Sequence, residues 1–188
     1  MLRDEVAKAL KVVQDGGIIL YPTDTIWGIG CDATNTEAVK KVYALKQREE
    51  TKSMIILLDT DTKLESYVQE VPALAFDLIE FAENPLTLVM PGAKNISPAL
   101  IAADGSIGVR VAKHPFCEQL IQRLRKPLVS TSANISGEAS PLYFSMIDQQ
   151  IIDGVDYVVD LEQHDKEIKN PSTIMRLSPN GSFEFIRR

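Results

Sequence analysis

The hydrophobic residues of this chain follow two patterns, a helical spacing and short continuous runs. The first helical pattern comprises Val6, Ala9, Leu10 and Val13. Gly16 and Gly17 come next, and they precede the apolar run 18–21. Because glycines are a common stop signal for a helix, the pattern predicts a helix that ends near Gly16 and a strand that follows it.

A second helix is predicted from residue 34 onward. The run 34–37 has the form of a capping box, with Thr34 as its first residue and Glu37 three positions later. The apolar face that follows comprises Val39, Val42 and Tyr43. Lys46 falls on this same face, one helical turn after Val42. The spacing leaves two interpretations open: a lysine that snorkels at the helix end, or a charge that belongs to an internal site.

The rest of the chain alternates apolar runs with helical patterns. The run 54–58 is entirely aliphatic, as is typical of a central strand that is covered on both faces. Further helices are predicted at 72–81 and 115–124. Further strands are predicted at 86–89, 108–111, 128–130, 157–161, 173–177 and 183–186. Strands alternate with helices early and crowd together late, which indicates an α/β layered domain with a mixed sheet.

The composition is that of a soluble protein with one sizeable core. The chain has 188 residues, 45% of them hydrophobic and 24% charged, and no linker divides it, so we predict one domain over residues 1–188. The acidic start does not resemble a signal peptide, and no apolar run is long enough to span a membrane. Cys31 and Cys117 have no paired spacing. We therefore expect a reduced, cytoplasmic protein without a membrane partner.

The net charge of −6 argues against a protein that grips nucleic acid through its overall field. A local basic patch is still compatible with it. One cluster comprises Lys40, Lys41, Lys46, Arg48 and Lys52, and another comprises Arg123, Arg125 and Lys126. Charged runs of this kind are usually solvated helix faces.

Small polar residues follow several of the predicted strands. The segments are 22–25, 130–134 and 170–173. Turn chemistry would explain each one separately, since Ser, Thr, Asp and Asn favour turns and caps. In open α/β sheets, however, ligands bind at the ends of strands. Because three such segments occur together, we predict that they line one concave face.

Two short motifs carry the strongest chemical signal. Lys46 and Arg48 offer a point charge beside a planar fork of donors, and Ser132 and Asn134 add a hydroxyl and an amide. Together these four side chains could hold a triphosphate. Phosphate-binding loops, nucleophile elbows and zinc-protease helices are absent from the sequence, and Cys31 has no evident basic partner. No metal site is expected from protein ligands alone.

Four motifs occur in order along the chain. They are Tyr21-Pro22-Thr23-Asp24-Thr25-Ile26-Trp27-Gly28-Ile29-Gly30-Cys31-Asp32, Lys46-Gln47-Arg48, Gly108-Val109-Arg110 and Ser132-Ala133-Asn134-Ile135-Ser136-Gly137. Over nearly the whole chain, this set resembles the YrdC-like threonylcarbamoyl-AMP synthase family in its short, single-domain form. The resemblance implies a twisted mixed β-sheet flanked by helices, with a deep, positively charged ligand cavity. It also implies a nucleotidyltransferase that condenses L-threonine, bicarbonate and ATP into threonylcarbamoyl-AMP and pyrophosphate, for the threonylcarbamoyladenosine modification of tRNA.

The resemblance assigns roles position by position. ATP would contact Lys46, Arg48, Ser106, Ser132, Asn134, Ser140 and Arg187, with Lys46 and Arg48 as the catalytic pair. Threonine would contact Thr25, Arg110, Ser130 and Ser172. Mg²⁺ would arrive with ATP and bridge its phosphates. The sequence departs from the family pattern at Glu49, where proline is frequent, and at Lys52, while the pair Arg187-Arg188 leaves the register of the last contact open.

Two other interpretations stay open at this point. A YrdC-like paralogue could bind double-stranded RNA or tRNA without this activity, although the acidic net charge and the threonine set argue against it. A carbamoyl-transfer domain of hydrogenase maturation is the third, but the zinc-binding cysteines expected beside it are missing. The enzyme interpretation adds RNA as a candidate partner, together with downstream proteins that transfer the threonylcarbamoyl group.

Overall fold

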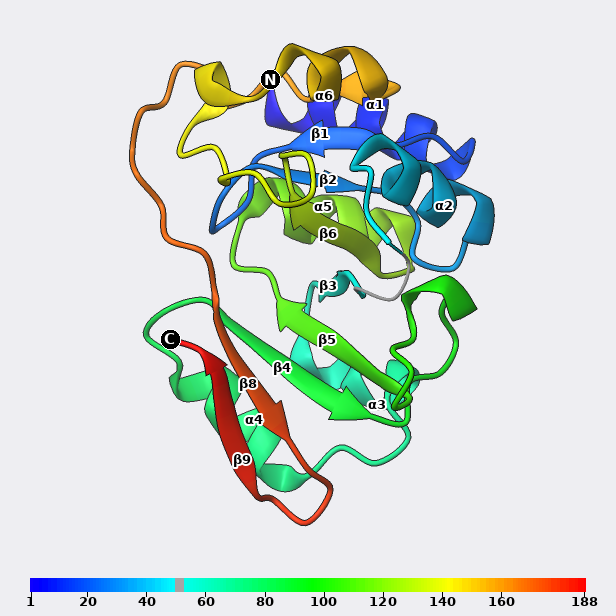
Figure 1. Cartoon of the computed structure of the whole chain (residues 1–188), viewed down its shortest axis with the longest axis vertical. Helices are drawn as coiled ribbons and strands as arrows, with labels where there is room; N and C mark the ends of the chain where they lie inside the picture. Colours follow the sequence, from blue (N-terminus) through cyan, green and yellow to red (C-terminus); the bar gives the residue numbers. More distant parts are fainter. Residues whose placement is uncertain (50–52) are drawn as a thin grey trace.

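The computed structural model describes residues 1–49 and 53–188. Within this part of the chain, nine strands form one sheet in the order β7-β1-β2-β6-β3-β5-β4-β8-β9 (Figure 1). The strands are β1 (Ile19–Tyr21), β2 (Gly28–Gly30), β3 (Ile55–Leu58), β4 (Leu86–Pro91), β5 (Ser106–Val111), β6 (Leu128–Ser132), β7 (Tyr157–Val158), β8 (Thr173–Leu177) and β9 (Phe183–Arg187). Three neighbouring pairs, β1–β7, β3–β5 and β4–β8, are parallel, and the others are antiparallel. The predicted mixed sheet is confirmed.

Helices cover both faces of this sheet. They are α1 (Leu2–Gln14), α2 (Thr36–Leu45), α3 (Leu64–Tyr67), α4 (Ala73–Phe81), α5 (Pro115–Leu124) and α6 (Gln149–Gly154), with short 3₁₀ turns at Asp61–Lys63, Pro98–Leu100 and Phe144–Met146. In Figure 1, β1, β2 and β6 lie in the upper half of the molecule and β5, β4, β8 and β9 in the lower half. None of the helices in the described ranges is both long and apolar enough to cross a membrane.

Strand β3 lies at the centre of the sheet and is covered on both faces. Ile56 and Leu58 are buried in a cluster with α2, whereas Leu57 is buried in a second cluster with α1 and α5. Alternate side chains of a strand point to opposite faces, so the continuous aliphatic run supplies both cores. This confirms the prediction for residues 54–58.

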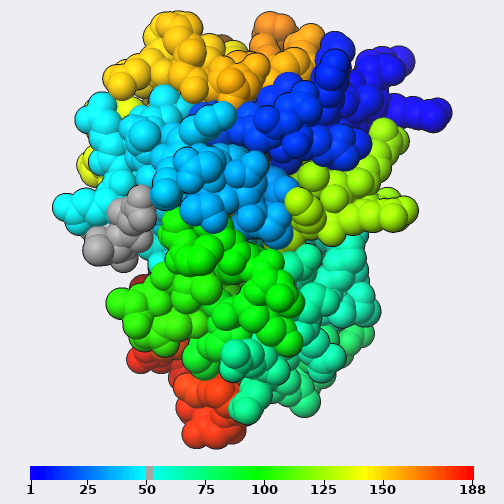
Figure 2. All heavy atoms as spheres, turned by 90° about the vertical axis from the view of Figure 1, so that its right-hand side faces the viewer, coloured from blue at the N-terminus to red at the C-terminus, as the bar shows by residue number. Residues whose placement is uncertain are grey.

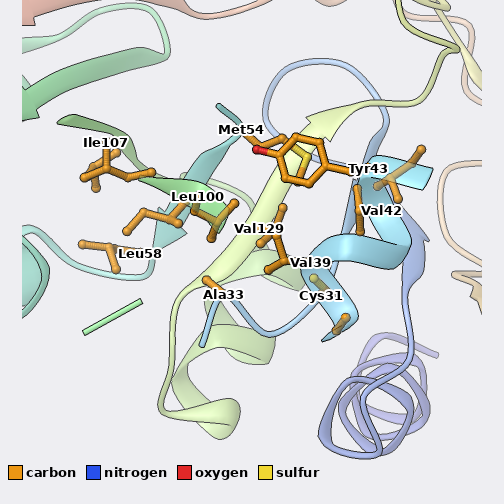
Figure 3. Packing of buried hydrophobic residues seen from close by; sticks show 14 of the residues in the cluster. Cys31, Ala33, Val39, Val42, Tyr43, Met54, Leu58, Leu100, Ile107 and Val129 are labelled. Carbon is orange, nitrogen blue, oxygen red and sulfur yellow. The ribbon is translucent and has the colours of Figure 1, made fainter. Parts of the chain in front are cut away.

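The apolar stripe of α2 packs as the sequence predicts, but the N-cap differs. Figure 3 shows Val39, Val42 and Tyr43 directed into the buried cluster. The capping box that begins at Thr34 is wrong: Asn35 is the N-cap, and its side-chain oxygen accepts from Ala38 N at 3.1 Å. The Thr34 hydroxyl instead donates to Asp32 Oδ1 at 2.7 Å. That carboxylate takes the hydroxyl away from the helix, so the next residue caps it.

The upper and lower halves are joined beside α2. Tyr43 OH donates to Ala99 O at 3.0 Å, and Ser97 Oγ donates to Thr36 Oγ1 at 2.9 Å. Figure 2 shows the side of the molecule where α2 lies against the segment that connects β4 to β5, in green. One bond lies at each end of α2, so together they hold the helix in a fixed place relative to the lower half of the sheet.

Strand β2 has no apolar run, and the sequence pattern did not predict it as a strand. Its glycines allow β2 to lie close to the Tyr21 ring and to β6. A Cβ on Gly30 would lie 2.2 Å from Val129 O and 2.8 Å from a ring carbon of Tyr21. Tyr21 also donates to Val129 O at 3.0 Å, so its ring is fixed across β2. Only glycine fits beneath that ring.

Candidate functional site

A cavity of about 270 Å³ lies where the two halves of the sheet meet. Its lining comprises Thr25, Ile26, Trp27, Gly28, Arg48, Ser53, Met54, Ile55, Thr87, Arg110, Ser130, Thr131, Ser132, Ser140, Pro171, Ser172, Ile174 and Arg187. The three polar strand-end segments predicted to share a concave face all contribute to it. The lining carries three arginines and, among the described residues, neither Asp nor Glu. The cavity therefore favours anions.

Most of the sequence-predicted site residues reach this cavity. Those that line it are Thr25, Arg48, Arg110, Ser130, Ser132, Ser140, Ser172 and Arg187. Lys46 and Asn134 lie buried behind the wall, and Ser106 is outside the lining. Lys52, whose role the sequence left open, lies outside the described residues. The register of the sheet explains the convergence: Ile55 pairs with both Ser130 and Gly108, and Gly28 pairs with Ser132.

Arg110 is the most constrained charge in the cavity wall. Its side chain is 4% exposed and lies 3.3 Å from Asp24 Oδ1, measured from Nη2. The pair is close but poorly aligned, since Nε and Nη2 of Arg110 have no hydrogen-bond partner within the described part of the chain. Buried guanidinium N–H groups are costly to leave unpaired. Asp24 Oδ1 also lacks a hydrogen-bond partner there, so Arg110 is a buried cation of the cavity wall that Asp24 satisfies only in part.

Hydroxyl groups lie beside this arginine. Ser172 Oγ and Thr87 Oγ1 are 2.8 Å apart, and both side chains are buried. Arg187, at the end of β9, donates from Nε and Nη2 to Ser172 O at 3.1 and 2.7 Å. Burial, followed by the nearby charge of Arg110, lowers the pKa of Arg187. A second positive charge thus stands at the rim, tied to the same segment as Ser172.

Lys46 is held beneath the cavity wall by main-chain oxygens. Its side chain is 1% exposed, and Nζ donates to Ser132 O and to Asn134 O, the latter at 2.6 Å. In return, Lys46 O accepts from Ser136 N at 2.8 Å. Burial, followed by the charge of Arg48, lowers the pKa of Lys46 to about 8. The lysine and the Ser132–Ser136 segment therefore form one interlocked unit.

The end of α2 places Arg48 at the cavity. Gln47 has a positive φ of 51°, Gln47 N donates to Ala44 O, and Arg48 N donates to Tyr43 O. These are the two bonds of a Schellman motif, which reverses the chain directly after the helix. Arg48 Nη2 then donates to Ser53 O at 2.9 Å. The turn explains why Lys46 points inward below the wall while Arg48 reaches the cavity itself.

Asn134 and Ser106 have local structural partners in this structure. Asn134 Nδ2 donates to Glu138 O at 2.7 Å and to Ile135 O at 3.1 Å, which closes the turn that carries Ser140 toward the cavity. Ser106 Oγ donates to Asp104 Oδ1 at 2.6 Å. Asp104 in turn pairs with Arg176, away from the cavity. The structure therefore groups Asn134 with the site and leaves Ser106 apart from it.

Two lining residues were missed by the sequence-based prediction, although each carries a signal. Thr87 is the one polar residue in the run 86–90, and a hydroxyl inside an apolar strand indicates a special environment. Trp27 packs against Phe144 with ring centroids 4.9 Å apart. This contact holds the segment that contains Ser140 and Phe144 beside the cavity. As the only tryptophan, placed among the polar residues after β1, it could have been expected at a ligand site.

The segment that joins β7 to β8 closes one side of the site. It runs along the left side of Figure 1, from the upper to the lower half, and ends at Ser172. Lys169 Nζ donates to Thr23 O at 3.3 Å and to Glu162 Oε2 at 3.1 Å. Glu162 also pairs with His114 at 2.9 Å. These contacts fix the segment against the loop that carries Thr25.

Comparisons with known proteins agree with this arrangement. A protein of Pseudoalteromonas translucida (strain TAC 125) named threonylcarbamoyl-AMP synthase is 38% identical over 158 residues, which cover 82% of this chain and 84% of that protein. The crystal structure of P. abyssi Sua5 complexed with L-threonine has a TM-score of 0.81 and 25% identity, and the match covers 92% of this chain. It covers 50% of the Sua5 chain, so this chain spans about half of that protein.

A third relative supports the fold alone. The crystal structure of E. coli YciO matches with a TM-score of 0.85 at 22% identity, over 100% of this chain and 90% of that one. The family model of Sua5, YciO and YrdC proteins, described as "Telomere recombination", matches residues 11–188. With this match over nearly its whole length and the ordered motifs gathered around one cavity, the chain belongs to the Sua5/YciO/YrdC family.

Proposed function

We propose that this chain is a threonylcarbamoyl-AMP synthase, which condenses L-threonine, bicarbonate and ATP and releases pyrophosphate. The observation that carries the proposal is Arg110, buried in the wall of a cationic cavity with two N–H groups unpartnered. A relative that is 38% identical has this name, and the P. abyssi Sua5 structure contains L-threonine. An RNA-binding surface would not require a buried subsite of this kind.

The amino-acid end of the cavity suits a threonine. A guanidinium can bind both oxygens of a carboxylate, and Arg110 brings a guanidinium with unused hydrogen-bonding capacity to the cavity wall. Thr25, Ser130 and Ser172 supply hydroxyls around this point. Hydroxyls that both donate and accept can orient the amine and the side-chain hydroxyl of the substrate. We assign these four residues to threonine.

The other end of the cavity suits the phosphates of ATP. Arg48 is the cation there, and Ser132 and Ser140 are the neutral donors. Arg187, which the resemblance assigns to ATP, is bonded to Ser172 O and so adds its charge from the threonine side of the cavity. Lys46 and Asn134 shape the wall behind them, and the ammonium group of Lys46 adds positive charge at close range. Ser106 would need a change in its bond to Asp104 to reach a nucleotide. We therefore place it last among the proposed ATP contacts.

The chemistry follows from placing these substrates side by side. The amine of threonine attacks the carbon of carbon dioxide, with loss of a proton, or of bicarbonate, with loss of water, to give a carbamate. A carbamate oxygen then attacks the α-phosphorus of ATP, and pyrophosphate leaves. Negative charge builds up on the phosphate oxygens during this step, so the arginines stabilise the transition state more than the ground state. A side-chain nucleophile is unnecessary, because much of the acceleration comes from proximity.

Mg²⁺ is proposed as a companion of ATP rather than as a resident of the protein. No group of three or more His, Cys, Asp or Glu side chains in the described ranges could hold a metal ion. The serine and threonine hydroxyls in the cavity lining are compatible with an ion that keeps its water and binds through phosphates. When bound there, Mg²⁺ would neutralise charge on the leaving pyrophosphate. The protein residues orient the phosphates around it.

The test is release of pyrophosphate in a mixture of the protein, ATP, Mg²⁺, bicarbonate and one amino acid at a time. We expect release with threonine and little with valine or alanine. Valine has the shape of threonine but lacks the hydroxyl, and alanine lacks both the hydroxyl and the shape. Release that does not depend on the amino acid would contradict the proposal. We further propose that the product is passed to a threonylcarbamoyl-transfer protein for tRNA modification, which the same mixture can test once that protein and tRNA are added.

A further inference from the structure

Thr87 is a fully buried threonine in the lining of the cavity. It lies on β4, between the strand that carries Arg110 and the strand that follows Ser172. It pairs with Ile174 on β8, and its neighbour Leu88 pairs with Val109 on β5. Thr87 is therefore level with Arg110 on the floor of the cavity.

The hydroxyl of Thr87 has one hydrogen bond among the described residues, to Ser172 Oγ at 2.8 Å. Its exposed fraction is 0%, so water outside the cavity cannot replace this bond. Ser172 is 4% exposed and directly precedes β8, and its main-chain oxygen is held by Arg187. Its side chain could rotate about one bond. Thr87 Oγ1, at 2.8 Å, makes the shorter of two contacts that restrict this rotation, and Arg187 Nη2 donates to the same Ser172 oxygen at 3.5 Å.

We propose that Thr87 is a positioning residue for the amino-acid substrate, and this rests on the proposed function. When the Thr87 hydroxyl donates to Ser172 Oγ, the proton of Ser172 stays available for an acceptor on the ligand. Ser172 and the unpartnered N–H groups of Arg110 then present donors to the same substrate. Without Thr87, Ser172 can turn its hydroxyl away, and the amino acid loses one oriented donor.

The side chain on the other face of the same strand pair offers a matched control. Thr173, the first residue of β8, pairs with Leu86 and lies in a separate surface groove beside α4. Thr173→Val removes the same hydroxyl group from a partly buried side chain that lies away from the cavity. Thr87→Val keeps the shape and the branching of the side chain, and Thr87→Ser keeps its hydroxyl.

The experiment measures threonine binding by calorimetry and, in parallel, the KM values for threonine and ATP. For Thr87→Val we expect a rise of about fivefold or more in both the Kd and the KM of threonine, since a buried hydroxyl partner is left unsatisfied. The KM of ATP should change less than twofold. Thr87→Ser should restore most of the threonine affinity, and Thr173→Val should match the unmodified protein.

The outcomes separate this inference from the proposed function. Unchanged threonine affinity in Thr87→Val overturns the role of Thr87, as does an equal rise in the KM of both substrates, which would indicate a general structural effect. If the unmodified protein binds threonine but releases no pyrophosphate, the proposed function fails, while weaker binding by Thr87→Val still supports the positioning role. If it binds no threonine, both fail.

Discussion

Replacing Arg110 tests the site at its most constrained charge. Arg110→Lys keeps a cation near Asp24 but loses the planar fork that can bind both oxygens of a carboxylate. The structure leaves two N–H groups of the guanidinium unpartnered, and the lysine cannot reproduce both. The loss of one charge-assisted hydrogen bond costs about 1.5–3 kcal/mol. We expect kcat/KM for threonine to fall by about 10- to 150-fold.

The assay is steady-state release of pyrophosphate, with threonine varied at saturating ATP and then ATP varied at saturating threonine. The effect should concentrate on threonine, because Arg110 lies at the amino-acid end of the cavity. Thermal unfolding is the control for the fold. An Arg110→Lys protein with unchanged Tm and unchanged kcat/KM for threonine would refute the assignment of Arg110 to the substrate.

A second substitution separates binding from stability. Arg110→Met leaves Asp24 as a buried carboxylate without its cation, which costs about 3–5 kcal/mol. For a chain of this size that corresponds to a fall in Tm of roughly 6–20 °C. Adding Asp24→Asn should recover much of the Tm, because the uncompensated charge is gone, but it should not recover threonine activity. Recovery of activity in the double variant would contradict the reasoning.

The other predictions concern the phosphate end and the sheet. Arg48→Ala should lower kcat/KM for ATP about tenfold or more, whereas the exposed Arg123→Ala on α5 should not; equal activities would reject the phosphate assignment of Arg48. Because the pKa of Lys46 is lowered from 10.5 to about 8, the unfolded chain binds more protons between these values, so the free energy of unfolding should rise with pH through that window. Urea titrations across it should show that rise reduced in Lys46→Met, and an identical pH dependence would exclude Lys46 as its source. Gly30→Ala should lower the Tm by about 2–12 °C through overpacking, since its Cβ would lie 2.2 Å from a main-chain oxygen of β6, while Gly28→Ala, with no contact closer than 3.4 Å, should change it little in a thermal melt.

Local patterns were sufficient where burial follows directly from the spacing of apolar residues. The strand 173–177 was predicted with the bounds that the structure has, and the stripe of α2 correctly placed Lys46 facing inward. The same spacing could not reveal what Lys46 binds, because its acceptors lie 86 and 88 residues further along the chain. The position of such a charge is local information, and its partner is a property of the sheet topology.

Two of the errors involve contacts that cross the fold, and a third comes from a weak hydrophobic signal. Thr34 was expected to cap α2, but Asp32 takes its hydroxyl, and that carboxylate is itself fixed by Lys126 at 2.7 Å. The strand 157–161 was predicted too long: β7 stops at Val158, and the next main-chain N–H, of Val159, donates to Leu20 O at 2.9 Å. Strand β2 was missed because glycines carry no hydrophobic signal. A residue distant in sequence therefore contributes to the first two errors, Lys126 at the cap of α2 and Leu20 at the end of β7.

The strand order also determines when the sheet can close during synthesis. Strand β1 can pair with β2 as soon as both are synthesised. Its other edge stays unpaired until β7 is synthesised, because there Ile19 pairs with Tyr157. All three residues of β1 are buried in the finished protein, so this edge is an apolar template for pairing with other chains until then. At ribosomal speed the interval is on the order of ten seconds. A chain that ends before residue 157 would leave this edge of β1 unpaired and open to association with other chains.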